Sequence, residues 1–222
     1  MGFNFDGKSE DISLKRLTKI ANGQTGDVYK YKNSALKIFR KGTNTPIDEP
    51  TAQHLTTIAT QRILLPRKLL FYNKTFVGYT YKLVSKRGAG KRMITLPKDE
   101  LIGNIAILES DIKTLSDNKV LLNGIDPTNY IFNGDLFISD PSKYSILDIF
   151  STEELERLNK YQLHLLITAI LASETKKSNI SNAKEAQFKQ LLMMKDDEQD
   201  SSDFFTNVIP EEDTVKEFIL KL

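Results

Sequence analysis

The chain has 222 residues, of which 40% are hydrophobic, 27% charged and 9% aromatic. This is the composition of a globular protein, and it excludes collagen-like, intrinsically disordered and membrane-embedded classes. Thirty-one Lys and Arg against 29 Asp and Glu leave a formal charge of +2, which excludes a chain-wide basic surface for nucleic acid. The absence of cysteine, together with only two histidines, excludes disulfides, thiolate zinc sites, cysteine nucleophiles and tri-histidine metal sites.

Neither a targeting segment nor a membrane span is expected. Residues 1–10 carry Asn, Asp, Lys and Glu and lack the apolar core of a signal peptide. The longest apolar stretch, residues 163–172, is interrupted by His164 and Thr168 and is too short to cross a bilayer. We therefore expect a soluble, cytoplasmic protein with no membrane partner.

Short alternating segments separated by turn signals fill the first third of the chain and predict a mostly antiparallel sheet. Strands are expected over residues 13–20, 27–31, 35–39, 67–72 and 75–84. The last two form a hairpin around Asn73 and Lys74. Apolar residues at positions 52, 55, 58 and 59 predict one helix over residues 51–63.

The second half of the chain has helical periodicity. Helices are expected over residues 97–115, 151–172, 182–194 and 214–222, and Ser151 with Glu154 has the spacing of a capping box. Two short apolar runs, 120–125 and 130–138, lie between the first two helices, and the second run turns back at Asn133-Gly134. The basic segment 85–92 and the acidic segment 195–203 are expected to be solvated connectors.

A glycine-containing segment, residues 21–28, joins the first two predicted strands. Rossmann and Walker loops open a helix instead, so both are excluded by this placement. Gly23 and Gly26 would let backbone amides approach a phosphate without a Cβ atom in the way. The alternative is an ordinary hairpin that happens to contain two glycines.

Lys37 lies inside the apolar strand that follows this segment. A lysine in such a strand has to direct its amine toward a carboxylate or an anionic ligand. A nucleotide beneath the glycine segment would place its phosphates within reach of that amine. The alternative is a lysine whose stem lies along an edge strand while the amine reaches solvent.

Asn129 and Asp140 flank the predicted hairpin of residues 130–138, which brings their side chains to the same end. Amide and carboxylate oxygens are hard ligands that suit Mg²⁺ held between a protein and phosphates. The alternative is turn chemistry, since Asp-Pro and Pro-Thr-Asn are common in turns.

The order of these features resembles the protein-kinase superfamily, and most of all its small, divergent bacterial protein-kinase-like members. The resemblance covers about residues 13–172. It implies an α+β, two-lobed fold: a β-rich N-terminal lobe with one helix over residues 1–84, and a reduced helical C-terminal lobe over residues 85–222. It also implies ATP and Mg²⁺ as cofactors and transfer of the γ-phosphate to a hydroxyl of a protein or of the chain itself.

The resemblance also implies a role for each matching residue. Those of the phosphate loop are Ala21, Gly23, Gly26 and Val28, with Ala21 in place of the first usual glycine. Ala35 would pack on adenine, and Lys37 would hold the α- and β-phosphates. Backbone groups of a hinge would read the adenine edge, at Tyr81, Lys82, Leu83 and Val84. Asn129 and Asp140 would hold Mg²⁺.

Three positions depart from the family pattern. Gly124 stands five residues before Asn129, where the family has its catalytic Asp, and Asp126 is the nearest carboxylate that could act as the base. The usual Glu partner of the strand lysine is not evident; Glu49 and Gln53 are the two candidates. Only about ten residues separate Asp140 from the next predicted helix, which leaves no room for a peptide-docking platform.

These departures keep other functions open. One alternative is a pseudokinase, a nucleotide-binding regulatory module without efficient transfer, and another is a small-molecule kinase. A third is an unrelated α+β protein in which Lys37 faces solvent and Asp140 caps a turn. His54 and His164 are expected to serve packing, and no nucleic-acid partner is expected.

Overall fold

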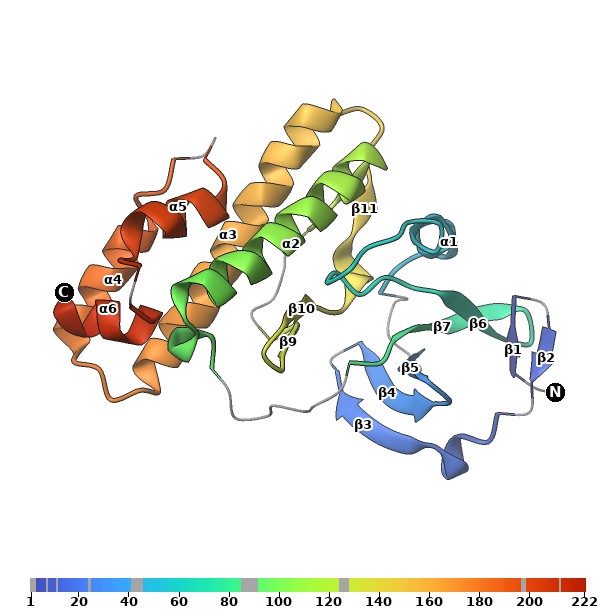
Figure 1. Ribbon diagram of the computed structural model, residues 1–222. Coiled ribbons are helices and arrows are strands. Elements are labelled where there is room, and N and C mark those ends of the chain that lie inside the picture. Colours follow the sequence, from blue (N-terminus) through green and yellow to red (C-terminus); the bar gives the residue numbers. More distant parts are fainter. Residues whose placement is uncertain are drawn as a thin grey trace.

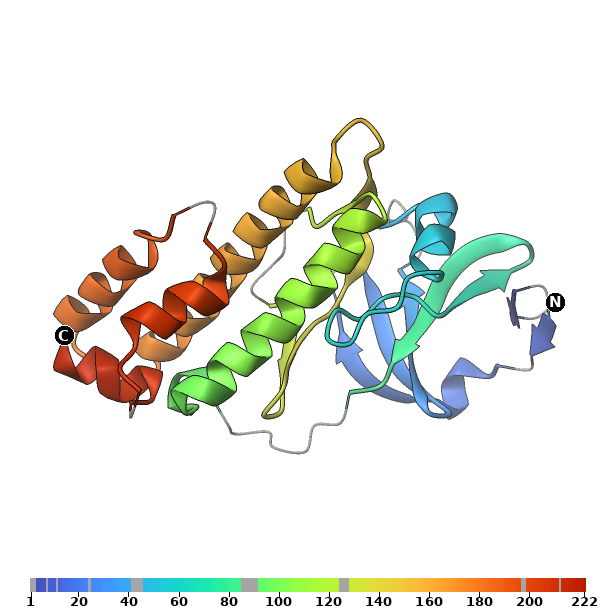
Figure 2. The same ribbon diagram turned by 45° about the horizontal axis from the view of Figure 1, so that its top comes forward.

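The computed structural model describes residues 3–6, 8–10, 12–23, 25–40, 46–84, 92–123, 128–196, 199–211 and 213–222. These residues form an α+β structure, as expected from the sequence. An antiparallel sheet built from the first part of the chain lies beside a group of helices built from the second part (Figure 1). The short strands of the second part lie between the sheet and the helices (Figure 2).

The main sheet has seven strands within the described residues, in the order β2-β1-β6-β7-β5-β4-β3, and every neighbouring pair is antiparallel. Its strands are β1 (Phe3–Phe5), β2 (Lys8–Glu10), β3 (Thr18–Asn22), β4 (Gly26–Tyr31), β5 (Ser34–Phe39), β6 (Lys68–Tyr72) and β7 (Thr75–Lys82). The alternating segments at 27–31, 35–39, 67–72 and 75–84 are thus confirmed as strands.

Two parts of the N-terminal segment differ from expectation. The chain adds β1 and β2, which the sequence pattern did not predict; β1 pairs with β6, where Phe3 lies opposite Tyr72. The strand predicted over 13–20 begins only at Thr18, because residues 14–16 form the 3₁₀ turn η1 (Leu14–Arg16). Leu14 and Leu17 pack against a small buried cluster that includes Leu36 of the sheet, so these apolar residues belong to a packed turn.

The helix expected over residues 51–63 is much shorter. It forms α1 (Glu49–Leu55), capped by the Asp48 side chain, which accepts a hydrogen bond from the Thr51 amide. The following residues leave the helix because the backbone amides of residues 61–63 all donate to the buried carboxylate of Asp111, at 2.6–2.9 Å. Ile63 then bridges to Ile138, so residues 61–65 attach to the second half of the chain.

The second half contains five α-helices and two two-stranded sheets within the described residues. Its main elements are η2 (Met93–Thr95), α2 (Lys98–Asp117), β8 (Val120–Leu121), β9 (Tyr130–Phe132), β10 (Leu136–Ile138), η3 (Pro141–Lys143), β11 (Ser145–Ile146), α3 (Thr152–Lys176), α4 (Asn182–Leu192), α5 (Ser201–Val208) and α6 (Val215–Lys221). The capping box of Ser151 and Glu154 is confirmed at the start of α3. Helices α2 and α3 lie side by side; α5 packs against α2, and α4 packs against α3 (Figures 1 and 2).

The acidic segment 195–203 is only in part a connector. Its last three residues belong to α5, which the sequence pattern missed. The carboxylate of Glu109 on α2 accepts hydrogen bonds from the amides of Ser201 and Ser202 at 2.6 and 3.1 Å, which satisfies the N-terminus of α5. Phe204 and Phe205 are buried below it, so tertiary contacts stabilise a helix whose own sequence is acidic at its start.

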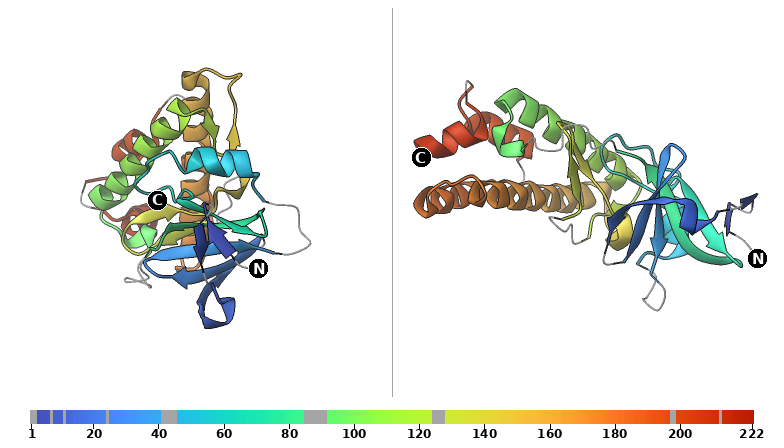
Figure 3. Two further views of the ribbon diagram at one scale, coloured as in Figure 1. Left: turned by 90° about the vertical axis from the view of Figure 1, so that its right-hand side faces the viewer. Right: turned by 90° about the horizontal axis from the view of Figure 1, so that it is seen from below.

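One large core runs through both parts of the molecule, from Leu69 and Tyr79 of the sheet to Leu163 and Phe188 of the helices. A smaller core lies on the opposite face of the sheet, where Phe5 and Ile12 cover Leu36 and Leu70. Helix α1 and the segment leading into β3 therefore lie on opposite faces of the sheet (Figure 3). No helix within the described ranges combines the length and apolar character that spanning a membrane requires.

Candidate functional site

A cavity of about 230 Å³ opens between the main sheet and the β9–β10 hairpin. Both halves of the chain line it: Ala21, Asn22, Gly23, Val28, Lys37 and Tyr81 come from the sheet, and Thr128, Asn129, Tyr130, Ile131, Ser139 and Asp140 from the hairpin and its flanks. Ligand sites are commonly placed at such a junction between two structural units.

Lys37 is the buried cation of this cavity. It lies in the middle of β5, its residue is 3% exposed, and its ammonium forms an ion pair with the Asp140 carboxylate. Burial lowers the pKa of Lys37, and the adjacent Asp140 opposes part of that shift. The interpretation in which Lys37 faces solvent is therefore wrong.

A glycine on the neighbouring strand allows β7 to approach Lys37 closely. In the register of β5 and β7, Ile38 lies opposite Gly78. A Cβ atom added to Gly78 would come within 2.1 Å of the Lys37 carbonyl oxygen, closer than real Cβ atoms approach any backbone atom. Gly78 thus sets the position of the strand that carries the buried lysine, and no sequence motif pointed to it.

The glycine-containing turn is held by backbone and side-chain hydrogen bonds. The Gly23 amide donates to the Gly26 carbonyl at 2.8 Å, and Arg40 donates to the Gly23 carbonyl at 3.0 Å. A Cβ on Gly26 would lie 2.3 Å from the Ile38 carbonyl oxygen, so this glycine permits the close pairing of β4 with β5. Gly23 lines the cavity, whereas Gly26 is not among its lining residues.

Asn129 and Asp140 converge, as their positions around the hairpin predict. The amide and the hydroxyl of Ser139 both donate to the Asn129 carbonyl, at 2.8 and 3.1 Å, which ties the two ends of the hairpin together. Asp140 has φ = 70°, in the left-handed region that non-glycine residues rarely adopt. Backbone strain of this kind clusters at functional sites, and here it accompanies the contact between Asp140 and Lys37.

The residues present are suited to holding Mg²⁺ together with phosphates. Both Asn129 and Asp140 line the main cavity and also a second, very small cavity beside it. Among the described residues, no three His, Cys, Asp or Glu side chains lie close enough together to hold a metal ion by themselves. Nucleotide-bound Mg²⁺ characteristically takes only one or two protein ligands and completes its shell with phosphate oxygens and water.

Three tyrosines surround the Asp140 carboxylate. Burial together with the negative charge of Asp140 raises the pKa values of Tyr79, Tyr81 and Tyr144, so their phenols are neutral. The hydroxyl groups of Tyr79 and Tyr144 are buried and have no hydrogen-bond partner among the described residues. Unpaired buried hydroxyls are uncommon and are retained where they serve an unmade contact or a bound ligand.

The structure brings together seven of the residues singled out in the sequence. Those that line the cavity are Ala21, Gly23, Val28, Lys37, Tyr81, Asn129 and Asp140. Gly26, Ala35, Lys82, Leu83 and Val84 do not line it, although Ala35 lies directly opposite Tyr81 in the strand register. Asp126 and Gly124 lie outside the described residues, as does most of the basic connector.

The two candidate partners of Lys37 are elsewhere. Glu49 and Gln53 both lie on α1 and are exposed, and the Gln53 amide faces Thr56 at 3.5 Å. In their place, Asp140 pairs with the lysine. The expectation that a residue of the first helix supplies the partner is therefore wrong in this conformation, because α1 ends at Leu55 and its exposed face carries these two side chains.

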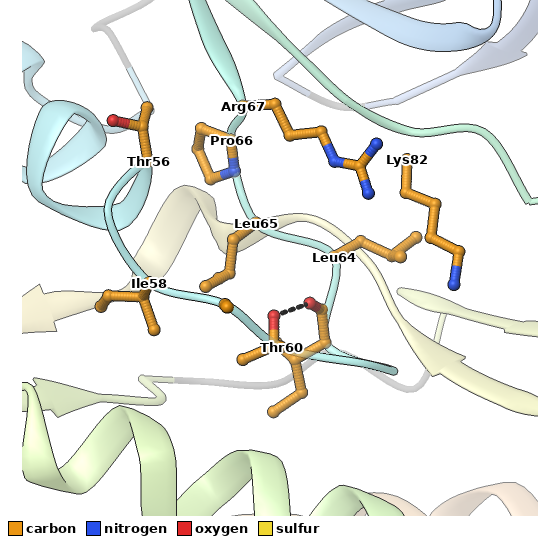
Figure 4. Close-up of a pocket in the computed structure, with 10 residues that line it drawn as sticks. Thr56, Ile58, Thr60, Leu64, Leu65, Pro66, Arg67 and Lys82 are labelled. Carbon is orange, nitrogen blue, oxygen red and sulfur yellow. Dashed lines mark hydrogen bonds between the residues drawn. The ribbon is translucent and has the colours of Figure 1, made fainter.

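Lys82, expected in the hinge, directs its side chain to a different cavity. This second cavity, of about 270 Å³, lies beside residues 56–67, and the Arg67 and Lys82 side chains extend along one side of it (Figure 4). Side chains alternate along a strand, so Tyr81 faces the Lys37 cavity while Lys82 faces away. Lys82 could therefore contact a ligand in the Lys37 cavity only through its own backbone groups.

Several lining residues have no sequence motif. Asn22, Thr128, Tyr130, Ile131 and Ser139 belong to this group. The signal available for them is adjacency, because each directly neighbours a predicted site residue or lies in the hairpin between two of them.

No protein-family model matches the chain, and no curated protein sequence matches it.

Proposed function

We propose that the chain binds ATP with Mg²⁺ in the Lys37 cavity and transfers the γ-phosphoryl group to a hydroxyl of a protein or of itself. The observation that carries this proposal is the ion pair of buried Lys37 with Asp140 in a cavity that also contains Gly23 and Asn129. The architecture we propose is the two-lobed protein-kinase-like one, with lobes over residues 1–84 and 85–222. Use of ATP also agrees with the expected cytoplasmic location.

Each charged group has a role in this proposal. The Lys37 ammonium would receive oxygens of the α- and β-phosphates, while Asn129 and Asp140 would hold Mg²⁺, which neutralises charge on the phosphates. The ion pair with Asp140 keeps the charge of the buried Lys37 ammonium compensated while no nucleotide is bound. Phosphoryl transfer depends mainly on positioning and charge neutralisation, which these groups supply.

The transfer itself forms a bond from the acceptor oxygen to the γ-phosphorus and breaks the bond to the leaving ADP oxygen. The proton of the acceptor hydroxyl passes to a base, for which we propose Asp126. A missing base typically reduces the rate of transfer about 10²- to 10⁴-fold, whereas binding of the nucleotide does not require one.

The cavity has to widen to hold a whole nucleotide. Its volume of about 230 Å³ is below the range of about 300–1,000 Å³ that is usual for sites of small-molecule ligands. Lobe opening of this kind accompanies ligand entry in many transferases. Binding is therefore expected to be slower than diffusion and to change the exposure of the tyrosines near Asp140.

Two alternatives each rest on one observation. A nucleotide-binding regulatory module without transfer is favoured by Gly124 at the position where the family has its catalytic Asp. Asp140 is also the only carboxylate among the described residues that line the cavity. A small-molecule kinase is favoured by the short segment 141–151, which alone separates Asp140 from α3.

Calorimetry with ATP, in the presence and absence of Mg²⁺, tests the proposal. Lys37→Met and Asp140→Asn are each expected to weaken binding at least tenfold. Lys30→Met, an exposed lysine on the adjacent strand β4, is the matched control and is expected to bind as the wild type does. Transfer of labelled γ-phosphate, followed in parallel, separates the kinase from the regulatory module, and absence of ATP binding by the wild type contradicts both.

A further inference from the structure

One face of the long helix α3 is apolar and accessible to solvent. The elements α2, α4, η2 and β8 pack against the other faces of this helix, where its buried residues lie. On the accessible face, Leu158 is 37% exposed, Tyr161 is 46% exposed and Leu165 is half-buried. No core formed by the described residues includes these three side chains. Nothing in the proposed phosphotransfer uses this face.

The exposed apolar residues of α3 form one continuous stripe. Residues three or four positions apart lie on the same face of a helix. At this spacing, Leu158, Tyr161 and Leu165 are followed by two half-buried small residues, Ala169 and Ala172. At a rise of 1.5 Å per residue, this apolar stripe is about 21 Å long. It consists of large side chains in its first half and small ones in its second half.

The apolar stripe is complementary to itself when two copies of α3 pair in antiparallel orientation around Leu165. In that arrangement, each residue lies beside the residue of the second copy that is equally far from Leu165 in the other direction. Tyr161 then meets Ala169 of the second copy, and Leu158 meets Ala172. Every contact except the central one therefore joins a large side chain to a small one, which lets two helices approach closely and interlock.

The charges at the two ends of α3 favour the same orientation. The first turn of the helix is acidic, with Glu153 and Glu154, and the last turn is basic, with Lys176. Antiparallel pairing around Leu165 brings Glu154 of each copy close to Lys176 of the other. In the part of the chain that the structure describes, Lys176 forms no salt bridge. Parallel pairing would instead bring like charges together at both ends.

We propose that the chain forms a homodimer in which the apolar stripes of two α3 helices pack antiparallel about a two-fold axis at Leu165. A two-fold interface uses the same surface patch on both copies, so the patch has to be complementary to itself, as this stripe is. Because only one helix of each copy takes part, the interface is small, and monomer and dimer should interconvert with concentration. The dimer does not depend on nucleotide binding.

Sedimentation equilibrium of the full chain over a range of concentrations tests the association. The mass should rise with concentration from 25.2 kDa toward twice that value. Leu165→Glu brings two carboxylates together at the axis and should weaken association at least tenfold. If a melting curve shows that this variant does not fold, Tyr161→Glu, at a more exposed position of the stripe, replaces it. A mass that stays at 25.2 kDa up to millimolar concentration, or association that the folded variant leaves unchanged, overturns the proposal.

Single cysteines report the orientation of the helices, because the chain has no cysteine of its own. Leu165→Cys should form a disulfide between two copies under mild oxidation, since the two cysteines lie next to each other at the axis. Leu158→Cys should not, because antiparallel pairing separates the two copies of this position by about 21 Å along the helices. Equal crosslinking at both positions, which a parallel pair would give, or crosslinking at neither contradicts the proposed arrangement.

A charge reversal tests the ends of the stripe. Lys176→Glu should weaken association about three- to tenfold, because each end of the dimer then holds two carboxylates close together. Lys113→Glu makes the same change of charge at an exposed position on α2 and should leave association unchanged. Equal effects of the two variants would contradict the pairing of Glu154 with Lys176.

Discussion

Lys37 and Asp140 are 103 residues apart in the sequence, yet the ammonium of one and the carboxylate of the other form an ion pair on the wall of the cavity. The lysine comes from a strand of the main sheet, and the aspartate directly follows the β9–β10 hairpin. The pair therefore joins the two halves of the molecule at the place where the proposed nucleotide binds.

Removing one member of this pair should destabilise the fold. Asp140→Ala leaves the Lys37 ammonium buried and uncompensated, at an expected cost of about 2–4 kcal/mol in the free energy of unfolding. The double variant Lys37→Met with Asp140→Ala should recover part of the loss, because no unpaired charge remains. Urea unfolding of the wild type, both single variants and the double variant measures the coupling, and strictly additive losses would show that the two groups do not interact.

Gly78 offers a test of strand spacing at the same point. Gly78→Ala places a methyl group against the Lys37 carbonyl and should cost about 1–3 kcal/mol, with weaker ATP binding as β5 moves. Gly103→Ala is the matched control. Gly103 lies within α2 with open space around its Cβ position, so alanine there should stabilise by up to about 1 kcal/mol. Thermal unfolding measures the melting temperature of both variants. Equal shifts of the two melting temperatures in the same direction would contradict this account.

Asp111 should stabilise the attachment of residues 61–63. Asp111→Asn retains the shape but presents an amide N–H group to backbone donors, which should cost about 2–4 kcal/mol. Hydrogen exchange at the amides of these residues should accelerate. Asp117 is an exposed aspartate at the end of the same helix, so Asp117→Asn controls for the loss of charge. Equal losses of stability in the two variants would contradict the proposed role of Asp111.

His164 should make the helical part sensitive to acid. Burial lowers its pKa, while its ring nitrogens contact the Ser201 hydroxyl and the Leu192 carbonyl at 3.2 and 2.8 Å. Since the unfolded chain binds the proton more tightly, stability should be unaffected above about pH 6.5 and should fall as the pH drops below that value. Melting temperatures between pH 5 and pH 8 for the wild type, His164→Gln and the control His54→Gln measure this effect. A melting curve of His164→Gln with the same acid dependence as the wild type would rule out His164 as its source.

The buried hydroxyl of Tyr79 has no hydrogen-bond partner among the described residues, and its effect on stability can be measured. Tyr79→Phe should raise the free energy of unfolding by up to about 1 kcal/mol, because it removes a buried hydroxyl that has no partner among the described residues. Tyr161→Phe, at a half-exposed position on α3, should have no effect. A loss of stability in Tyr79→Phe would instead show that the hydroxyl is hydrogen-bonded in solution.

Much of the fold follows from local sequence patterns, and the failures share one cause. The strands around Lys37 and the long helices are visible because their apolar residues repeat with the period of the element. The strand β1 is only three residues long and is fixed by pairing with β6 some 65 residues later, which no local pattern encodes. The end of α1 and the start of α5 are likewise set by distant carboxylates, those of Asp111 and Glu109.

The candidate site was predictable to a similar degree. The convergence of Asn129 and Asp140 follows from a hairpin between them, and the burial of Lys37 follows from its apolar neighbours. The partner of Lys37 was not predictable, because it depends on how the two halves of the chain come together. Gly78 was missed for the same reason, since its importance lies in the neighbouring strand.

The attachment of residues 61–65 has a mechanical consequence. These residues are bonded to Asp111 on α2 and to Ile138 on β10, so the sheet cannot slide past the helices at this point. If nucleotide binding widens the cavity, as we propose, we therefore expect the sheet to rotate about residues 61–65 rather than to slide. In such a rotation, the sheet residues that line the cavity would move away from the β9–β10 hairpin, while the contacts of residues 61–65 with Asp111 and Ile138 would be kept.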